Sequence, residues 1–183
     1  NLKEKYSPDY IVGSVHHVRG IPIDFDEANY KSAVQACGSL ENLFCEYYDT
    51  QYKLIKECKP EVIGHFDLIR IFAGDFEPSS KVEELEHRNI EQVNSYGGVF
   101  EVNSRAYRKG FLQPFPNFRI LNRMAELGAE ITFGDDAHGI EEVGLCYLEM
   151  QEEVSKIFSE VIAFEKTQTG LEKVKFKLND VLK

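Results

Sequence analysis

The stretch ITFGDDAH, residues 131–138, ends an apolar run with two adjacent aspartates and a histidine. Asp136 and His138 are two positions apart, and side chains at that spacing share one face when the backbone is extended. A carboxylate and an imidazole together form a mixed oxygen and nitrogen ligand set that Zn²⁺, Fe²⁺ and Mn²⁺ accept. The motif is short, so its meaning depends on what the fold brings beside it.

Other polar residues also follow β-rich runs. His16 comes directly after DYIVGSV, His65 closes the run EVIGHF, and Glu101 and Asn103 close GVFEVN. A single histidine at such a position is about as often a hydrogen-bonded residue as a ligand. A set drawn from several strand ends points more strongly to a metal site. The candidate metal ligands are His16, His65, Asp136 and His138.

Short β-rich runs alternate with helical patterns along the chain. Strands are expected over 9–15, 61–66, 98–103 and 130–135; helices from 39 to 58, after Ser80, over 118–127 and from about 139 to 160; and a terminal hairpin from 161–166 and 173–178. Strand followed by helix, four times, indicates an α/β fold with parallel strands. The carboxyl ends of such strands meet at one rim, where the loops converge.

Composition favours one globular unit. A chain of 183 residues buries roughly 70% of its unfolded surface. No apolar stretch approaches the roughly 20 residues of a membrane span, and the first residues have no signal-peptide pattern. A cytoplasmic protein without a membrane partner is therefore expected. The four cysteines lack C-x-x-C spacing, which favours buried free thiols.

The net charge narrows the choice of partner. Twenty-one basic residues stand against 31 acidic ones, a formal charge of −10. Such a surface repels polyanions, so nucleic acid is not an expected partner. A small anionic substrate stays compatible if bound metals and a few arginines reverse the field locally.

Five stretches, taken in order, resemble the later motifs of the histidinol-phosphate phosphatase branch of the polymerase and histidinol phosphatase (PHP) superfamily. They are VGSVHHV (12–18), KPEVIGHFDLIRIF (59–72), FEVNSRAYRKG (100–110), QPFPNFRIL (113–121) and ITFGDDAH (131–138). The resemblance implies a metal-dependent phosphoesterase built as a single PHP-like domain, 1–183, on a distorted barrel of seven βα units. Up to three metal ions would cluster at the carboxyl ends of its strands.

The resemblance also implies roles for particular residues. It places metal ligands at His16, His65, Asp136 and His138, of which Asp136 and His138 would also take part in catalysis, and phosphate-binding arginines at Arg70 and Arg108. A guanidinium fork matches phosphate oxygens with two hydrogen bonds. The alternatives are a surface salt bridge for Arg70 and a solvated basic loop for Arg108, with Arg105 and Lys109. Glu101 and Asn103 could orient a ligand or the loop.

Two features depart from the family pattern. Complete members open with an H-x-H motif, and this chain contains none and does not begin with Met. We therefore expect the C-terminal portion of a larger protein, a partial barrel with an open sheet edge, which is prone to pairing. The edge would pair with the missing segment or another chain, or be covered by the chain's own helices and hairpin. Asp135 adds a carboxylate, either beside the metal site or on the outer face.

The expected activity is hydrolysis of L-histidinol phosphate to L-histidinol and phosphate, in histidine biosynthesis, by water activated at Zn, Mn or Fe ions. The ligand set does not distinguish these metals. Two alternatives remain open. One is another phosphoesterase of the superfamily acting on nucleic acid, which the charge disfavours. The other is a non-catalytic fragment holding at most one metal, which the missing H-x-H favours.

Overall fold

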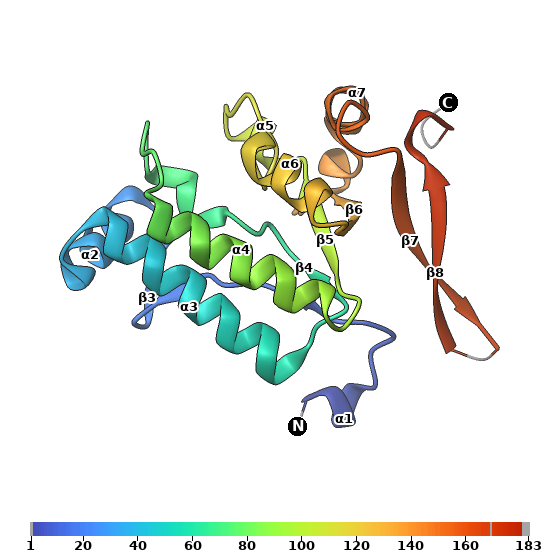
Figure 1. The fold of residues 1–183 in the computed structure, drawn as a ribbon, viewed down its shortest axis with the longest axis horizontal. Helices are drawn as coiled ribbons and strands as arrows, with labels where there is room; N and C mark the ends of the chain where they lie inside the picture. Colours follow the sequence, from blue (N-terminus) through green and yellow to red (C-terminus); the bar gives the residue numbers. More distant parts are fainter. Residues whose placement is uncertain (1, 169, 181–183) are drawn as a thin grey trace.

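The computed structural model describes residues 2–168 and 170–180. Its central element is a four-stranded parallel sheet in the order β1-β4-β5-β6 (Figure 1). The strands are β1 (Val12–Gly13), β4 (Val62–Ile63), β5 (Val99–Asn103) and β6 (Glu130–Gly134). The predicted α/β fold with parallel strands is confirmed. Within the described residues the sheet is open, since β1 pairs only with β4 and β6 only with β5.

Helices and two small antiparallel pairs complete the fold. The helices are α1 (Leu2–Tyr6), α2 (Glu27–Cys37), α3 (Leu40–Cys58), α4 (Ser80–Asn94), α5 (Arg105–Arg108), α6 (Phe118–Glu126) and α7 (Tyr147–Val154), with 3₁₀ turns at Leu68–Phe72, Ile140–Glu142 and Leu178–Asp180. Strands β2 (His17–Val18) and β3 (Ile21–Pro22) pair with each other, as do β7 (Glu160–Thr167) and β8 (Gly170–Lys177). The predicted terminal hairpin is therefore confirmed.

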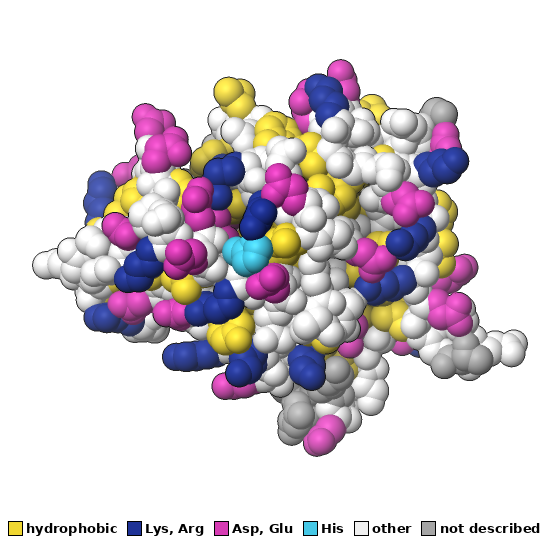
Figure 2. Space-filling model, viewed as in Figure 1, with side chains coloured by type: hydrophobic (Ala, Val, Ile, Leu, Met, Phe, Trp, Pro, Cys, Tyr) yellow, Lys and Arg dark blue, Asp and Glu magenta, His cyan; other side chains and the backbone are white. Residues whose placement is uncertain are grey.

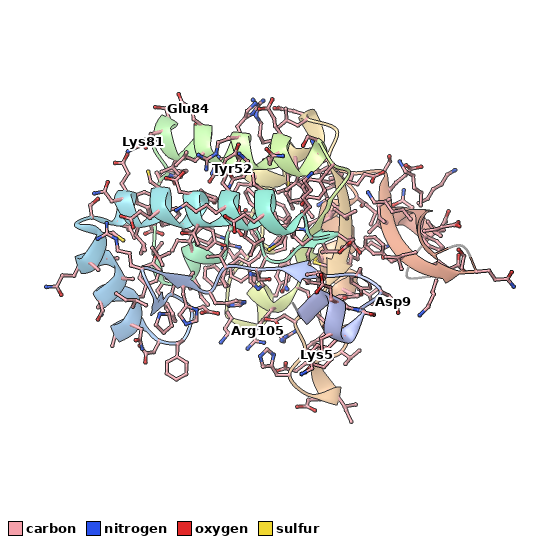
Figure 3. The ribbon with its side chains drawn as sticks, turned by 90° about the horizontal axis from the view of Figure 1, so that it is seen from below. Lys5, Asp9, Tyr52, Lys81, Glu84 and Arg105 are labelled. Atoms are coloured by element: carbon pink, nitrogen blue, oxygen red, sulfur yellow. The ribbon has the colours of Figure 1, made fainter. Side chains whose placement is uncertain are left out.

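The long helices α3 and α4 lie side by side (Figures 1 and 3). Helix α3 begins after Ser39, whose hydroxyl accepts a hydrogen bond from the backbone N–H of Asn42 at 3.1 Å, and it ends at Lys59 in a left-handed conformation. Such a cap satisfies one of the backbone donors that the first helical turn leaves unpaired. Helix α4 is capped by Ser79, one residue before the predicted Ser80.

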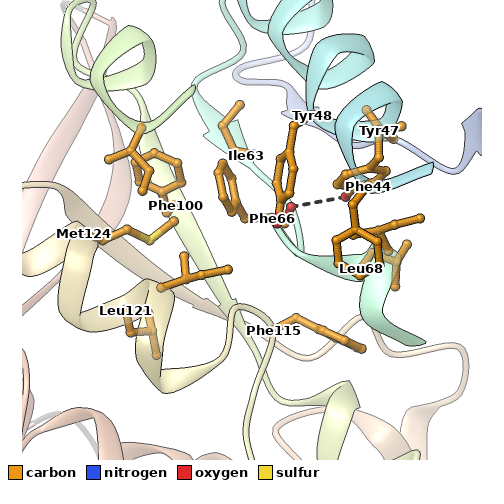
Figure 4. Packing of buried hydrophobic residues seen from close by; sticks show 14 of the residues in the cluster. Phe44, Tyr47, Tyr48, Ile63, Phe66, Leu68, Phe100, Phe115, Leu121 and Met124 are labelled. Carbon is orange, nitrogen blue, oxygen red and sulfur yellow. Dashed lines mark hydrogen bonds between the residues drawn. The ribbon is translucent and has the colours of Figure 1, made fainter. Parts of the chain in front are cut away.

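Aromatic side chains fill the space between the sheet and these helices (Figure 4). Phe66 and Phe100 meet edge to face with ring centroids 5.5 Å apart, and Tyr48 lies 5.5 Å from Phe66. The hydroxyl of the fully buried Tyr47 donates to the carbonyl of Phe66 at 3.2 Å. This bond satisfies a polar group that would otherwise be costly to bury. The core thus fixes the segment that directly follows β4.

The prediction of one helix from about 139 to 160 is wrong. The structure has a 3₁₀ turn, then α7, and β7 already begins at Glu160. Two residues between the turn and α7 have positive φ, Gly144 at 72° and Cys146 at 63°. Residues in that left-handed region interrupt a right-handed helix. The apolar periodicity of this stretch did not reveal the interruption.

The terminal hairpin lies at the end of the sheet beside β6 (Figure 1). Lys173 of β8 pairs with Glu130 of β6 at 2.7 Å. The hairpin also reaches the segment before β1, where Phe164 stacks on Tyr10 with centroids 5.1 Å apart. Val12 of β1 nevertheless stays 50% exposed. Pairing of this edge with another segment stays a prediction.

Several composition-based expectations can be compared with the structure. All four cysteines are free; Cys37 and Cys45 are buried as predicted, but Cys58 is exposed. No described helix is both long and apolar enough to cross a membrane. On the face in Figure 2, Lys and Arg side chains are interspersed with Asp and Glu, so positive charge does not gather there.

Candidate active site

A cavity of about 120 Å³ lies at the carboxyl ends of the parallel strands. His16 follows β1, His65 follows β4, and Asp136 and His138 follow β6; all four line this cavity. They come together because parallel strands present their carboxyl ends at one edge of the sheet. The structure therefore brings together the four residues that the sequence proposes as metal ligands.

His16 is oriented by a carboxylate that the sequence reasoning did not single out. Its Nδ1 lies 2.8 Å from Oδ2 of Asp24, which also lines the cavity. This hydrogen bond raises the pKa of His16, although partial burial opposes the effect. In neutral His16 the carboxylate favours a proton on Nδ1, which leaves Nε2 as a free acceptor. Asp24 lies between β3 and α2, and no motif spacing in the sequence indicates it.

His65 is buried, with 7% of its surface exposed, and its Nδ1 has no hydrogen-bond partner among the described residues. Burial, with the nearby charge of His16, lowers the pKa of His65 to about 4. The rings of His16 and His65 meet edge to face, with centroids 4.9 Å apart. His65 is therefore a neutral imidazole with an unpaired buried nitrogen, the state in which histidine binds metal. In its chemical form, His65 can therefore contribute one nitrogen ligand to a divalent ion.

The backbone of His65 is held from the neighbouring strand. Oε2 of Glu101 accepts hydrogen bonds from the backbone N–H of His65 at 2.8 Å and from Nδ2 of Asn103 at 3.0 Å. His65 has a φ of 27°, a strained value that persists only where the surroundings enforce it. Burial raises the pKa of Glu101, and a Cβ at Gly134 would lie 1.9 Å from its Oε1. Glycine is therefore required beside this carboxylate.

Asp136 and His138 share a third partner, Arg105. Its Nη1 lies 2.7 Å from the backbone oxygen and 3.2 Å from Oδ2 of Asp136, and it also hydrogen-bonds Nδ1 of His138. Asp136 has a φ of 48°, which turns the chain at this point. Within the described residues, no three His, Cys, Asp or Glu side chains are arranged so that they could hold a metal ion together.

Asp135 serves the loop rather than the cavity. Its Oδ1 accepts from the backbone N–H of Ala137 at 3.0 Å, and its Oδ2 accepts from that of Gly144 at 2.7 Å. Both carboxylate oxygens are thus used to hold the segment between β6 and α7. Asp135 is not among the residues that line the His16–His65 cavity. The sequence left two positions open for this extra carboxylate, beside the metal site or on the outer face. The structure does not place Asp135 beside the proposed metal site.

Arg70 lies outside the cavity. Its Nε bonds Oδ2 of the buried Asp67 at 2.9 Å, its Nη2 donates to the carbonyls of Gln113 and Pro114, and its guanidinium stacks between Phe111 and Phe115. Only Phe115 of these neighbours also lines the cavity. The alternative of a surface salt bridge for Arg70 is wrong. Arg70 pairs with Asp67 in a mostly buried salt bridge, in which the Arg70 side chain is 15% exposed.

Arg108 is not in a solvated loop. Its side chain is 12% exposed, and Nη2 donates to the backbone oxygen of Asp135 at 2.7 Å. Its Nη1 is buried without a partner among the described residues. Arg105, the first residue of α5, and Lys109, which directly follows that helix, line the cavity, whereas Arg108 supports the loop that carries Asp136. His87 lies on α4 and does not line the cavity, and its Nδ1 lies 2.8 Å from Nη2 of Arg123.

Comparison with known proteins now decides the family. The model of the PHP domain matches residues 1–105, more than half of the chain. The chain belongs to the PHP domain family. It is 48% identical over 153 residues to a Schizosaccharomyces pombe protein named "Probable histidinol-phosphatase". The aligned region makes up 80% of this chain and 50% of that protein. Over 182 residues it is 31% identical to the histidinol-phosphatase of Saccharomyces cerevisiae, covering 85% of this chain and 53% of the yeast protein.

A solved structure supports the same PHP fold. A crystal structure from Listeria monocytogenes, described as a candidate histidinol phosphatase, aligns with a TM-score of 0.72 and 24% identity. The alignment covers 81% of this chain and 61% of the other. The chain spans about half the length of the two yeast relatives. Phosphoesterases of the PHP family are generally metal-dependent, but neither the identity nor the number of the metal ions follows from these matches.

Proposed function

We propose that the complete protein is a metal-dependent phosphomonoesterase that hydrolyses L-histidinol phosphate to L-histidinol and phosphate, in histidine biosynthesis. The observation that carries this proposal is the convergence of His16, His65 and Asp136, from three separate strand ends, on one cavity. Relatives named as histidinol-phosphatases match most of the chain. A small-molecule phosphate, rather than nucleic acid or a membrane, is the proposed partner, and a cytoplasmic location stays a prediction.

In this proposal, Zn, Mn or Fe ions, up to three in the complete protein, are held by His16, His65, Asp136 and His138. When bound, such ions supply Lewis-acid stabilisation of phosphoryl oxygens and lower the pKa of water. His65 presents an unpaired nitrogen for this purpose. Asp24 holds His16 in position by the bond between Oδ2 and Nδ1.

Asp136 and His138 are the proposed catalytic pair, because both side chains lie at the cavity on the loop after β6. A carboxylate that holds a metal ion through one oxygen can accept a hydrogen bond from water through the other, so Asp136 can position the water, while His138 would act through the ion that it holds.

Arg70 and Arg108 are the proposed phosphate ligands. The buried and unpaired Nη1 of Arg108, close to the Asp136 loop, favours that role. Arg70 does not line the cavity, but its guanidinium lies 4.4 Å from the ring centroid of Phe115, which does.

The product of the complete reading frame tests the proposal. Phosphate release would be measured with L-histidinol phosphate, a generic aryl phosphate and single-stranded DNA, each with Zn²⁺, Mn²⁺ or Fe²⁺. We expect metal-dependent turnover of L-histidinol phosphate that exceeds turnover of the other two substrates. Preferential cleavage of DNA would favour the nucleic-acid alternative. No turnover of any substrate would favour the non-catalytic alternative.

A further inference from the structure

Arg105 lies among the residues proposed to hold metal, although no motif assigned it a role. It is the first residue of α5, and its backbone N–H donates to Oδ1 of Asn103 at 2.8 Å. Its side chain is 23% exposed. In Figure 3 it lies on the side of the molecule away from Tyr52, Lys81 and Glu84, which mark α3 and α4. The start of α5 is thereby fixed beside the cavity.

The guanidinium of Arg105 uses the same atoms that a metal ion would need. Nη1 is 3.2 Å from Oδ2 of Asp136, hydrogen-bonds Nδ1 of His138, and is 3.3 Å from Nε2 of His138. A guanidinium is a permanent cation and only donates hydrogen bonds, so the imidazole must offer it a lone pair on Nδ1 or Nε2. In the tautomer with a proton on Nδ1, that nitrogen donates to the backbone oxygen of Asp136 at 2.8 Å and Nε2 carries the lone pair. Metal ligation requires such a lone pair too, with the ion about 2 Å from the nitrogen. Both cations cannot occupy this place.

We propose that Arg105 is an internal counter-cation that competes with a divalent metal ion for Asp136 and His138. The guanidinium neutralises the carboxylate and holds the imidazole. A metal ion that enters this part of the site must displace the guanidinium, so Arg105 lowers the apparent metal affinity. The inference rests on the proposed metal site, and it adds a residue that sets the metal concentration at which the site fills.

Lys109 offers a matched control within the same cavity wall. It lies four residues after Arg105, lines the same cavity, and is exposed. The structure shows no hydrogen bond from its side chain to Asp136 or His138 among the described residues. Removing its charge changes the local potential without freeing either ligand. Direct competition and a general charge effect are therefore separable.

The test measures the dissociation constants of Zn²⁺ and Mn²⁺ by competition with a chromophoric chelator. The proteins are the wild-type chain, Arg105→Met, Arg105→Lys and Lys109→Met. If Arg105 holds the ligands in most molecules, Arg105→Met tightens metal binding by about tenfold or more. Arg105→Lys, which keeps the charge and loses the planar fork, falls between the two. Lys109→Met stays within about threefold of the wild type, as expected for an exposed charge.

Two results of the titrations would overturn the inference. The first is an equal metal affinity in Arg105→Met and Lys109→Met. The proposed metal site would still stand in that case if the wild type binds metal. The second is no binding by any of the four proteins, which removes the metal site as well. Thermal unfolding verifies that each variant is folded. If Arg105→Met does not fold, the metal affinity of Arg105→Lys relative to that of the wild type tests the inference instead. In the wild type, saturating Zn²⁺ must also shift the ¹⁵N resonance of the Arg105 guanidinium; an unchanged resonance contradicts displacement.

Discussion

His16 and Asp24 form a carboxylate–imidazole pair, with Nδ1 2.8 Å from Oδ2, at the mouth of the cavity where the strand ends meet. The two residues flank the β2–β3 hairpin, whose first strand directly follows His16. The backbone N–H of Ile23 donates to the carbonyl of His16 at 3.0 Å and closes this loop. A local turn, rather than a long-range contact, thus sets the orientation of the first proposed ligand.

Replacement of Asp24 by Asn should weaken metal binding by about 10–100-fold, the usual effect of losing a carboxylate behind a histidine ligand. The amide keeps the size of the side chain but neither orients the imidazole nor increases its basicity as a carboxylate does. Chelator competition with Zn²⁺ measures the change. Asp49→Asn, at an exposed carboxylate of α3 that pairs with Arg88, is the control and should leave the affinity unchanged. Equal affinity in Asp24→Asn and the wild type would contradict the role given to this pair.

Gly134→Ala should destabilise the fold by about 1–3 kcal/mol, because the new methyl group overlaps the Glu101 carboxylate. Displacement of Glu101 also removes the hydrogen bond that holds the backbone of His65. The free energy of unfolding would be measured by urea titration for Gly134→Ala, Glu101→Ala and the double variant. The clash predicts that the two changes are non-additive, with a coupling of about 0.5–3 kcal/mol. Strictly additive effects would show that no such overlap exists.

Much of the fold could be predicted from the sequence because its strands are short apolar runs, each ending in polar residues. The runs around Val62 and Phe100 are buried on both faces, which is typical of a parallel sheet. Helix α2 was missed although its boundary signals are present. Asp26 caps its N-terminus by accepting from the N–H of Asn29 at 2.7 Å, and Gly38 ends it at a φ of 84°. Its apolar stripe is weak, with Tyr30 and Ala33 as two of its few buried residues.

The sequence predicted which four residues meet at the cavity, the proposed metal ligands, but it did not predict their surroundings. His16 and His65 stand directly after strands, so topology alone brings them together. Arg105 and Asp24 reach the cavity through a one-turn helix and a loop, and no periodic pattern marks such segments. Arg70 and Arg108, which the motifs singled out, are held mainly by backbone carbonyls and by Asp67. These contacts depend on the three-dimensional fold and leave no pattern in the sequence.

Glu86 should make the stability of the chain depend on pH. Burial raises its pKa to about 7 from 4.5, although Arg119 pairs with it at 2.8 Å. Because the folded state binds this proton more tightly than the unfolded state, the contribution of Glu86 to the free energy of unfolding falls as pH rises from 4.5 to 7, whereas that of His65, whose pKa burial lowers, rises over the lower part of the range. The decrease is at most about 3 kcal/mol. Urea titrations across this range should show that Glu86→Gln removes the decrease.

The control for that prediction is Glu83→Gln, since Glu83 contacts the same arginine at 3.2 Å from a half-exposed position. It should retain the wild-type pH dependence. If the free energy of unfolding of the wild type relative to Glu86→Gln instead rises between pH 4.5 and 7, the pairing with Arg119 outweighs burial at Glu86.

Arg70→Met should lower stability by about 3 kcal/mol, because it leaves the buried carboxylate of Asp67 without its charged partner. The double variant Arg70→Met with Asp67→Asn should recover part of this loss by removing the unpaired charge. Arg123→Met, at an exposed pair with Glu126, serves as the control and should cost less than about 1 kcal/mol. A cost at Arg70 no larger than that at Arg123 would leave only the proposed phosphate-binding role for this residue.

The most direct test of the central claim compares His65→Ala with His87→Ala in the product of the complete reading frame. Phosphate release from L-histidinol phosphate and the metal content per chain would be measured on the same samples. If histidines at separate strand ends hold the catalytic metal, His65→Ala loses metal and at least about 100-fold in kcat, while His87→Ala matches the wild type. Full turnover with full metal content in His65→Ala would contradict that claim.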